Sequence, residues 1–322
     1  MRRQFLRYLT IRTAAALALV FVVASGALLL AQLAPGDYAS QFGRDPAEVA
    51  ADRHRLGLDR PILEQYAAWL TRSLTLDLGE SFQYRRPVAS LVRERAGNTA
   101  LLATTALLFA TALGVGAGML TGSRRGALVS IVGGTSIALL SVPPLITSLL
   151  LLTIAARTGW LPVGGIGHPP PDASWIERAV TVARHLVIPA LALGLPLAAT
   201  VERLQSQALR EALDRPSTLA ARARGVPRSL IVTRHAWRLS LGPLLAIYGV
   251  LIGSLFSGSF AVELVTSWPG LGDLMRNALM ARDPYLVAGC AAAGAAFLAI
   301  AVLVADIAHA ALDPRIDEGA AS

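Results

Sequence analysis

Six long stretches of this 322-residue chain contain no Asp, Glu, Arg or Lys. A helix rising ~1.5 Å per residue needs about 20 residues to cross a hydrocarbon core of roughly 30 Å. Five stretches approach or exceed that length, whereas the fourth is short and contains two prolines. We therefore predict an all-α membrane protein with six transmembrane helices. The stretches are 22, 28, 31, 17, 24 and 20 residues long and cover Thr13–Ala34, Ala96–Ser123, Gly126–Ala156, His185–Val201, Leu239–Val262 and Leu286–Ala305.

The first stretch follows a basic start and has a secretory signal peptide as its alternative interpretation. Its 22 residues exceed the ~7–15 apolar residues of a signal sequence, and no small-x-small cleavage site precedes Pro35. We therefore interpret it as a membrane span.

The basic residues give the expected orientation. The chain has no lysine, so all 29 basic residues are Arg, and the net charge is +8. With six spans and the N-terminus inside, the cytoplasmic pieces hold 15 Arg against 6 acidic residues; they are 1–12, 123–126, 202–238 and 313–322. Basic residues in short loops mark the cytoplasmic side. We expect both termini inside, and we interpret the charge as a topology signal and not as nucleic-acid binding.

The same pattern divides the chain into segments. Residues 1–34 form an N-terminal tail and the first span, and 35–95 form an extracytoplasmic segment whose aromatic residues indicate a small folded extension. Residues 96–312 hold the remaining spans, including the cytoplasmic loop 202–238, and 313–322 form a cytoplasmic tail.

Several residues within the spans are candidates for packing or chemistry. Pro143-Pro144 is expected to break or kink the third helix. Asp306 is the one acidic residue deep within a span; it is a functional candidate by type, although its place near the end of the helix favours a structural role. GxxxG spacing, which permits close helix contact, occurs at Gly114, Gly118 and Gly122, and at Gly249 and Gly253.

The loop between the fourth and fifth spans has the clearest local signals. Asp214 can cap a helix that carries Pro216 in its first turn. Gly225 can supply a left-handed C-cap, and Pro227 can start a second helix. These signals predict an arginine-rich helix–Gly–helix elbow. Periodicity alone leaves open whether it docks to a soluble partner or lies on the membrane surface.

This elbow resembles the EAA loop of binding-protein-dependent ABC permeases, most closely that of the dipeptide/oligopeptide group. The resemblance lies in Ala220-Ala221-Arg222-Ala223-Arg224-Gly225, then Arg234-His235-Ala236 and Pro243. Two departures are present: Leu219 replaces the Glu that gives the loop its name, and the closing Pro lies further from Gly225 than usual.

Other motifs resemble the same group, in order, along nearly the whole chain. They are Ala34–Asp37, Leu56–Ile62, Gln65-Tyr66, Asp77–Ser81, Asn98-Thr99, Gly159–Pro162, Ser267–Gly272, Ala281–Asp283 and Leu312–Arg315.

The resemblance implies a type I ABC importer permease of the bacterial inner membrane. Its expected partners are a second permease, two ABC ATPase subunits, an extracytoplasmic substrate-binding protein and the lipid bilayer. Outer loops, among them Trp268, Pro269 and Gly270, would face the binding protein. The elbow would couple to the ATPase, with Gly225 as its hinge, through Ala220, Ala221, Arg222, Arg224, Gly225, Arg228, Arg234 and His235.

The resemblance leaves the substrate open among dipeptides, oligopeptides, nickel and glutathione. ATP and Mg²⁺ would belong to the partner subunits, because a phosphate-binding loop needs a lysine and this chain has none. This chain therefore cannot be the ATPase, and we expect no catalytic, cofactor or metal site in it.

Two other classes compete with this interpretation. A stand-alone secondary transporter or channel would need charged or unwound sites within its spans, which are scarce here, and would not need the elbow. An intramembrane enzyme would need paired Asp residues, a His/Glu zinc cluster or a Ser–His pair, none of which the spans offer.

Overall fold

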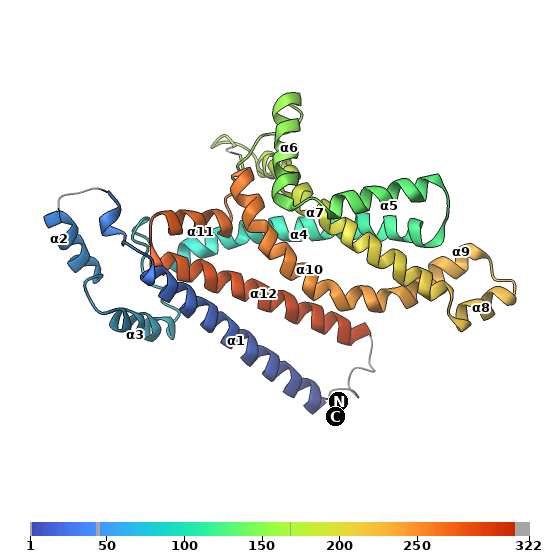
Figure 1. Ribbon diagram of the computed structural model, residues 1–322, viewed down its shortest axis with the longest axis horizontal. Helices are drawn as coiled ribbons and strands as arrows, with labels where there is room; N and C mark the ends of the chain where they lie inside the picture. The colour runs from blue at the N-terminus through green and yellow to red at the C-terminus, as the bar shows by residue number, and fades with distance from the viewer. Residues whose placement is uncertain (1, 43–45, 168, 313–322) are drawn as a thin grey trace. The chain divides into compact units, whose positions relative to one another are not determined.

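The computed structural model describes residues 2–42, 46–167 and 169–312, and these residues are predominantly helical (Figure 1). Within them the one β-type pairing is an isolated bridge between Glu80 and Pro87. The all-α prediction is confirmed, whereas the expected tail 313–322 and most of the Leu312–Arg315 motif lie outside the described residues. The helices are α1 (Arg2–Leu33), α2 (Pro46–Leu56), α3 (Ile62–Ser73), α4 (Val88–Ser123), α5 (Ala127–Leu140), α6 (Pro144–Thr158), α7 (Trp175–Leu213), α8 (Pro216–Ala223), α9 (Arg228–Leu230), α10 (Trp237–Thr266), α11 (Leu271–Met280) and α12 (Pro284–Leu312), with a 3-10 turn at Ala39–Phe42 and a π-helical stretch at Ile231–Ala236.

The described helices include five that are long and apolar enough to cross a membrane, and a sixth span exists if the bent pair α5 and α6 forms one. The two helices of that pair meet at 107°. Pro143 precedes α6 and Pro144 is its first residue, because proline lacks the N–H that a continuous helix would need there. The predicted break at Pro143-Pro144 is confirmed. The five single helices are Thr10–Leu33, Val88–Ser123, Trp175–Leu213, Arg228–Thr266 and Pro284–Val304.

The fourth predicted span lies in a much longer helix than its charge-free stretch indicated. α7 contains 39 residues and runs through Pro189 and Pro196. Its first turn is fixed by a capping box, in which the Glu177 N–H donates to Ser174 Oγ and the Ser174 N–H donates to Glu177 Oε2. Surrounding helices stabilise a membrane helix that contains proline, so the prolines did not shorten it.

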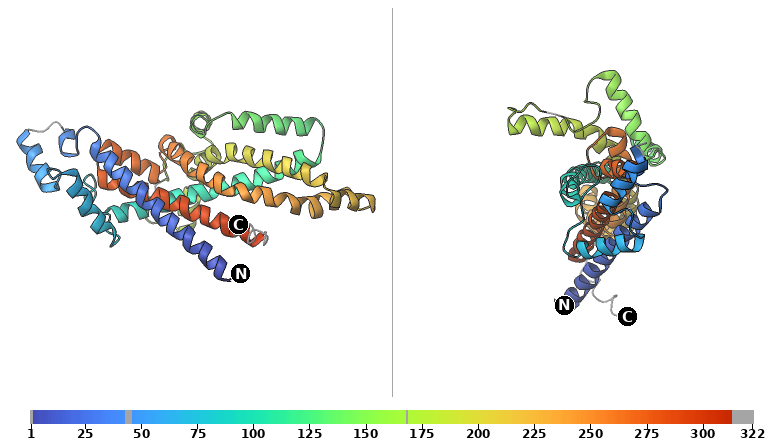
Figure 2. Two further views of the ribbon diagram at one scale, coloured as in Figure 1. Left: turned by 60° about the horizontal axis from the view of Figure 1, so that its bottom comes forward. Right: turned by 90° about the vertical axis from the view of Figure 1, so that its left-hand side faces the viewer.

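The chain forms two compact units. Of the described residues, the first holds Leu101–Trp268 and Ala301–Leu312, and the second holds Arg2–Ala100 and Pro269–Ile300. In the first unit, α7 is the central helix: α5, α6 and α10 pack against it, and α10 runs beside it in both views (Figures 1 and 2). The core of this unit includes Leu102, Ala106, Leu193, Val201, Leu251, Val262 and Trp268.

Three glycines on α4 let it approach α7 closely. A Cβ atom at Gly114 would lie 2.5 Å from Ala198 O, and one at Gly118 would lie 2.6 Å from Gln205 Cβ. The third glycine, Gly122, would place its Cβ 2.9 Å from a backbone oxygen of α7. The predicted role of this glycine series in helix packing is confirmed. At Gly249, by contrast, a Cβ atom would have no described neighbouring atom within 4 Å.

The second unit has its own core. Side chains from α1, α3, the start of α4, α11 and the start of α12 pack together, among them Leu28, Trp69, Val88, Leu274 and Leu286. The expectation that 35–95 contains a folded extension is confirmed, because α2 and α3 lie within it and Trp69 is buried.

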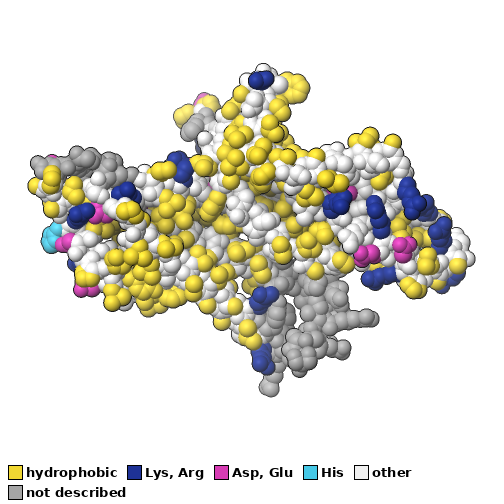
Figure 3. All heavy atoms as spheres, viewed as in Figure 1, with side chains coloured by type: hydrophobic (Ala, Val, Ile, Leu, Met, Phe, Trp, Pro, Cys, Tyr) yellow, Lys and Arg dark blue, Asp and Glu magenta, His cyan; other side chains and the backbone are white. Residues whose placement is uncertain are grey.

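Apolar side chains also cover much of the surface (Figure 3). Leu17 and Leu30 on α1 are 66% and 71% exposed, and Leu108 on α4 is 66% exposed. Such surfaces suit contact with lipid chains, because a helix face that contacts lipid does not need polar side chains.

Candidate functional site

The elbow begins where α7 ends at Leu213. Asp214 is the C-cap of α7, and its N–H donates to Arg210 O. The prediction that Asp214 caps the next helix is wrong, because Arg215 occupies the N-cap of α8 and no side chain bonds there. Arg215 is extended, as a residue preceding proline usually is, and Pro216 then starts the helix one position later.

The short helix α8 is fastened to the end of α7. The Thr218 hydroxyl donates to Ala212 O at 2.8 Å, and Thr218 is buried. Ala221, one turn further along, is buried as well, so one face of α8 packs inward and the opposite face is exposed.

Gly225 ends α8 in the left-handed conformation, with φ +80°. Its N–H donates to Arg222 O at 3.0 Å, and the Val226 N–H donates to Ala221 O at 3.3 Å. This pair of bonds is a Schellman motif. The predicted left-handed cap at Gly225 is therefore confirmed, and no described atom beyond its chain neighbours lies within 4 Å of the position of its missing Cβ.

The second arm of the elbow is the beginning of the fifth span. Pro227 is the N-cap of α9, the π-helical stretch follows directly, and α10 continues to Thr266. Arg234 and His235 lie in the π-helical stretch, a local form that often occurs at functional sites. The elbow thus connects α7 to the helical segment that leads into α10, and the connecting segment is Asp214–Pro227.

The predicted coupling residues divide by exposure. Ala221 is buried and serves packing, whereas the others lie on the surface: Ala220, Arg222, Arg224, Gly225, Arg228, Arg234 and His235. The structure brings Arg222 and Arg228 together at one hollow and places Arg224, Arg234 and His235 outside its lining.

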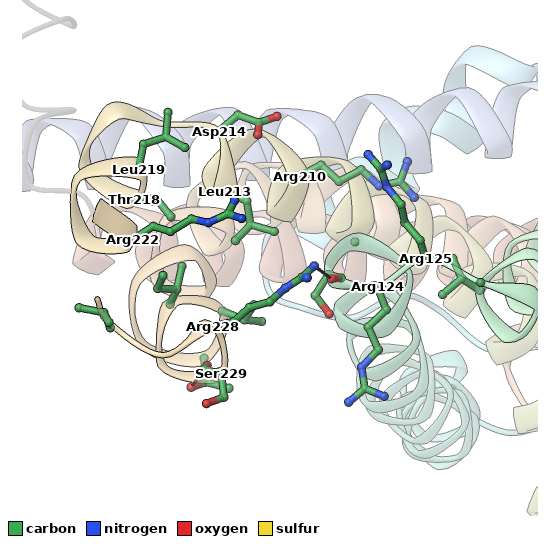
Figure 4. Close-up of a pocket in the computed structure, with 18 of the residues that line it drawn as sticks. Arg124, Arg125, Arg210, Leu213, Asp214, Thr218, Leu219, Arg222, Arg228 and Ser229 are labelled. Atoms are coloured by element: carbon green, nitrogen blue, oxygen red, sulfur yellow. Dashed lines mark hydrogen bonds between the residues drawn. The ribbon is translucent and has the colours of Figure 1, made fainter. Parts of the chain in front are cut away.

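That hollow has a volume of about 1420 Å³ and lies between the elbow and the α4–α5 loop. Arg222 and Arg228 extend into it from the elbow, and Arg124 and Arg125 contribute from the loop, where their side chains point in opposite directions (Figure 4). Arg210 on α7 completes the cationic lining. Arg124, Arg125 and Arg210 were not among the predicted coupling residues, although all three lie in the pieces predicted to be cytoplasmic.

Two arginines attach the elbow region to the end of α4. Arg228 Nη2 donates to Ser123 O at 2.7 Å, and Arg210 Nη2 donates to Thr121 O at 3.0 Å. The last carbonyl groups of a helix lack partners within the helix and carry partial negative charge, which makes them good acceptors for a guanidinium group. These two hydrogen bonds link α9 and the end of α7 to the end of α4.

A buried polar layer joins the same helices deeper in the first unit. The Thr121 hydroxyl on α4 donates to Glu202 Oε1 on α7 at 2.5 Å. Gln205 Nε2, one turn further, donates to Ser240 Oγ on α10 at 2.9 Å. Glu202 lies at the start of the predicted cytoplasmic loop 202–238, but its side chain is buried, because α7 continues past it. Polar pairs of this kind hold helices in register.

In the second unit, motifs that lie far apart in the sequence contact one another. The Ser81 hydroxyl donates to Asp283 Oδ2 at 2.7 Å, and Asp283 also accepts from the N–H groups of Gln83 and Leu286. Burial raises the pKa of Asp283, and these hydrogen bonds, which favour the carboxylate, act in the opposite direction. The motifs Asp77–Ser81 and Ala281–Asp283 therefore belong to one hydrogen-bonded network.

The loop before α11 is held in the same way. Asn98 Nδ2 donates to Pro269 O at 2.8 Å, and the Leu271 N–H donates to Thr99 Oγ1 at 2.8 Å. Trp268 packs in the core of the first unit and is fully buried. Contact of Trp268, Pro269 and Gly270 with a binding protein stays a prediction, and in this chain the Trp268 side chain serves packing.

Two known protein families match this chain. Residues 114–318 match the family described as "Binding-protein-dependent transport system inner membrane component", and residues 5–103 match the corresponding N-terminal family of the membrane component. The chain belongs to the binding-protein-dependent transport permeases.

Named relatives of this permease match it over nearly their whole length. A Brucella suis biovar 1 protein named as a peptide permease is 33% identical over 97% of this chain and 99% of its own. The glutathione transport system permease protein GsiC of Escherichia coli O6:H1 is 29% identical, covering 97% of this chain and 99% of its own. The oligopeptide transport system permease protein AppB of Bacillus subtilis is 28% identical, covering 96% and 99%.

Among solved structures, one titled as inward-facing conformations of the MetNI methionine ABC transporter matches with a TM-score of 0.50 and 18% identity. The match covers 73% of this chain and 98% of the other. It supports the type I importer permease fold. The permease is thus a multi-pass protein of the bacterial inner membrane, from a family of transport subunits that operate with ATPase and substrate-binding components.

Proposed function

We propose that this permease forms one part of the path by which an ATP-driven importer takes up peptides delivered by an extracytoplasmic binding protein. We further propose that it pairs with a second permease and that its elbow contacts one of two ATPase subunits, which hold the ATP and Mg²⁺. Three relatives support the substrate class, because they are named for peptides, oligopeptides and glutathione, and glutathione is itself a tripeptide.

The elbow is the observation that carries the coupling proposal. α8 is short, capped at Gly225 and anchored through Thr218, so its exposed face is presented as a rigid element. Arg228 and Arg210 connect its base to α4, and α7 and α10 continue from its two arms. A push on α8 by an ATPase subunit would therefore reach three long helices at once.

In the proposed cycle, ATP binding draws the ATPase subunits together and moves the elbows with them. The spans then change from inward-facing to outward-facing, and the binding protein releases the peptide into the path. A ligand that binds one of two states more tightly shifts the balance between them, which is how ATP would drive this change.

The contact can be tested with cysteine crosslinking. The native Cys290 is buried, so an introduced cysteine is the accessible thiol. Ala220→Cys on the exposed face of α8 should crosslink to an ATPase subunit in the assembled importer, and Ala221→Cys, its buried neighbour, should not. Equal crosslinking at both positions, or none at Ala220→Cys, would refute the contact.

Coupling itself can be tested at the glycine cap. Gly225→Val places a β-branched residue at φ +80°, a strain of about 1–2 kcal/mol, and should reduce peptide-stimulated ATP hydrolysis and uptake about tenfold. Gly159→Val is the matched control, because Gly159 caps α6 at φ +68° with similarly open space and lies outside the elbow. If both variants transport equally, the elbow does not couple.

The competing function is a secondary carrier or channel. Reconstituted vesicles separate the two: uptake that requires ATP, the binding protein and the ATPase subunits supports the importer, and uptake by the permease alone without ATP supports a carrier.

A further inference from the structure

The hollow beside the elbow carries a large excess of positive charge. Five of its lining residues are Arg and one, Asp214, is acidic. Arg210 and Arg228 each donate one bond to a carbonyl at the end of α4. Within the described part of the chain, Arg124, Arg125 and Arg222 form no ion pair. Guanidinium groups gathered in this way are suited to phosphate oxygens, which they bind through paired hydrogen bonds.

The lining also contains apolar side chains, which lie among serines and threonines. Val129 from α5, Leu213 from α7, and Val226, Ile231 and Val232 from the elbow face the same space. A small inorganic anion would leave these apolar side chains without a partner. A ligand with a phosphate at one end and hydrocarbon at the other would contact both kinds of surface.

The place of the hollow in the sequence gives its depth in the membrane. Arg124 and Arg125 directly follow the charge-free stretch Ala96–Ser123, so we expect them at the level of the lipid headgroups. α5 begins two residues later and exposes Leu128 by 60% and Ile131 by 65%. An apolar surface therefore continues from the hollow along a helix that is itself expected to contact lipid chains.

We propose that this hollow binds an anionic phospholipid of the cytoplasmic leaflet. Its phosphodiester lies within the cationic lining to which Arg124, Arg125 and Arg222 contribute, and its acyl chains follow the exposed face of α5. Basic pockets between transmembrane helices on the cytoplasmic side commonly bind anionic headgroups. The proposal rests on the predicted orientation and not on the coupling role of the elbow.

An acidic surface of an ATPase subunit is the other candidate occupant. The structure favours the lipid, because apolar side chains of α5, α7 and the elbow line the hollow, whereas the predicted coupling residues Arg224, Arg234 and His235 do not. Val129 and Ser130 of α5 also line the hollow, so it extends to a helix whose exposed side chains suit lipid.

The test uses the purified importer in mild detergent, titrated with phosphatidylglycerol or phosphatidylcholine and examined by native mass spectrometry. Wild-type protein should bind phosphatidylglycerol saturably and phosphatidylcholine weakly. Arg124→Gln/Arg125→Gln should weaken phosphatidylglycerol binding roughly thirtyfold, at about a factor of five for each Arg near the membrane surface. Both residues lie outside the elbow, so a loss of lipid binding is distinguishable from a loss of coupling.

The matched control is Arg85→Gln/Arg86→Gln, an adjacent and exposed pair in the second unit with the same change in charge. Retained binding in this control supports a specific site. An equal loss in both double variants, inorganic phosphate displacing the lipid completely at equal concentration, or binding by the permease alone but not by the whole importer would each overturn the proposal. The last result would assign the hollow to the ATPase subunit.

Discussion

The elbow and the Asp283 network both arise from motifs that the sequence marks clearly, yet they use their residues in opposite ways. In the elbow, Arg222, Arg224 and Arg234 are exposed. The hydrogen bonds around Gly225 join backbone groups only: the Gly225 N–H donates to Arg222 O, and the next N–H donates to a carbonyl of α8. In the second unit, Ser81 and Asp283 are buried and bond to each other across 202 residues. A marked motif therefore identifies either a surface for a partner or an internal joint, and burial separates the two.

The comparison predicts its largest effect at the internal joint. Asp283→Ala removes the acceptor of Ser81 Oγ, Gln83 N–H and Leu286 N–H, and leaving buried donors without partners should cost about 3 kcal/mol or more. We expect a large drop in the thermal midpoint of the detergent-purified permease. Asp172→Ala, which changes an exposed carboxylate, is the control and should melt as wild type does. Equal midpoints for the two variants would show that the joint is not structural.

The glycine contact between α4 and α7 should give the next largest effect. Gly118→Ala forces a Cβ against Gln205 and a backbone oxygen of α7, at a cost of about 1–3 kcal/mol. Gly116→Ala, half a turn away on the same helix, meets open space and should leave stability unchanged or slightly raised. The two thermal midpoints measure the contact, and a stable Gly118→Ala protein would mean that the helices separate easily.

A smaller and more local effect is expected in the elbow. Thr218→Val keeps the shape of the side chain and removes its hydrogen bond to Ala212 O, worth about 1 kcal/mol. The thermal midpoint should barely change, whereas hydrogen exchange at the amides of 218–226 should become faster. Ser217→Ala, the exposed neighbour, should leave exchange as it is. Unchanged exchange in Thr218→Val would show that packing alone fixes α8.

The smallest effect concerns pH and the second unit. Partial burial raises the pKa of Asp37, but the hydrogen bonds from Arg53, at 2.6 Å, and from Ser40 lower it more. The pKa of Asp37 therefore lies below its ordinary value of 3.8. Asp37 therefore stabilises the fold above about pH 4, and that contribution is lost as the pH falls through its lowered pKa. The thermal midpoint of wild type should exceed that of Asp37→Asn slightly at pH 7, by the small amount typical of a surface pair, and the two should converge in acid. A difference that persists at pH 2 would contradict this assignment.

The parts of the fold that were predictable depend on neighbours in the sequence. Pro143-Pro144 breaks a helix because of its own ring, and Gly225 caps one because of its own backbone freedom. The helix cap predicted at Asp214 failed because two residues compete there: Asp214 already ends α7, and Pro216 forces the residue before it to be extended. The charge-free stretch His185–Val201 also underestimated the length of α7. Absence of charge indicates which residues can lie in the hydrocarbon core, whereas the helix itself continues to Leu213.

The sequence by itself determined that this chain is a helical membrane protein, where its spans lie, and that an arginine-rich elbow interrupts them, because hydropathy, proline and glycine act over one or two turns. Only the tertiary structure decided that Arg124 and Arg210 share a hollow with Arg222, that Glu202 is buried, and that Ser81 meets Asp283. Those residues are separated by tens to hundreds of positions, and helix packing alone brings their side chains together.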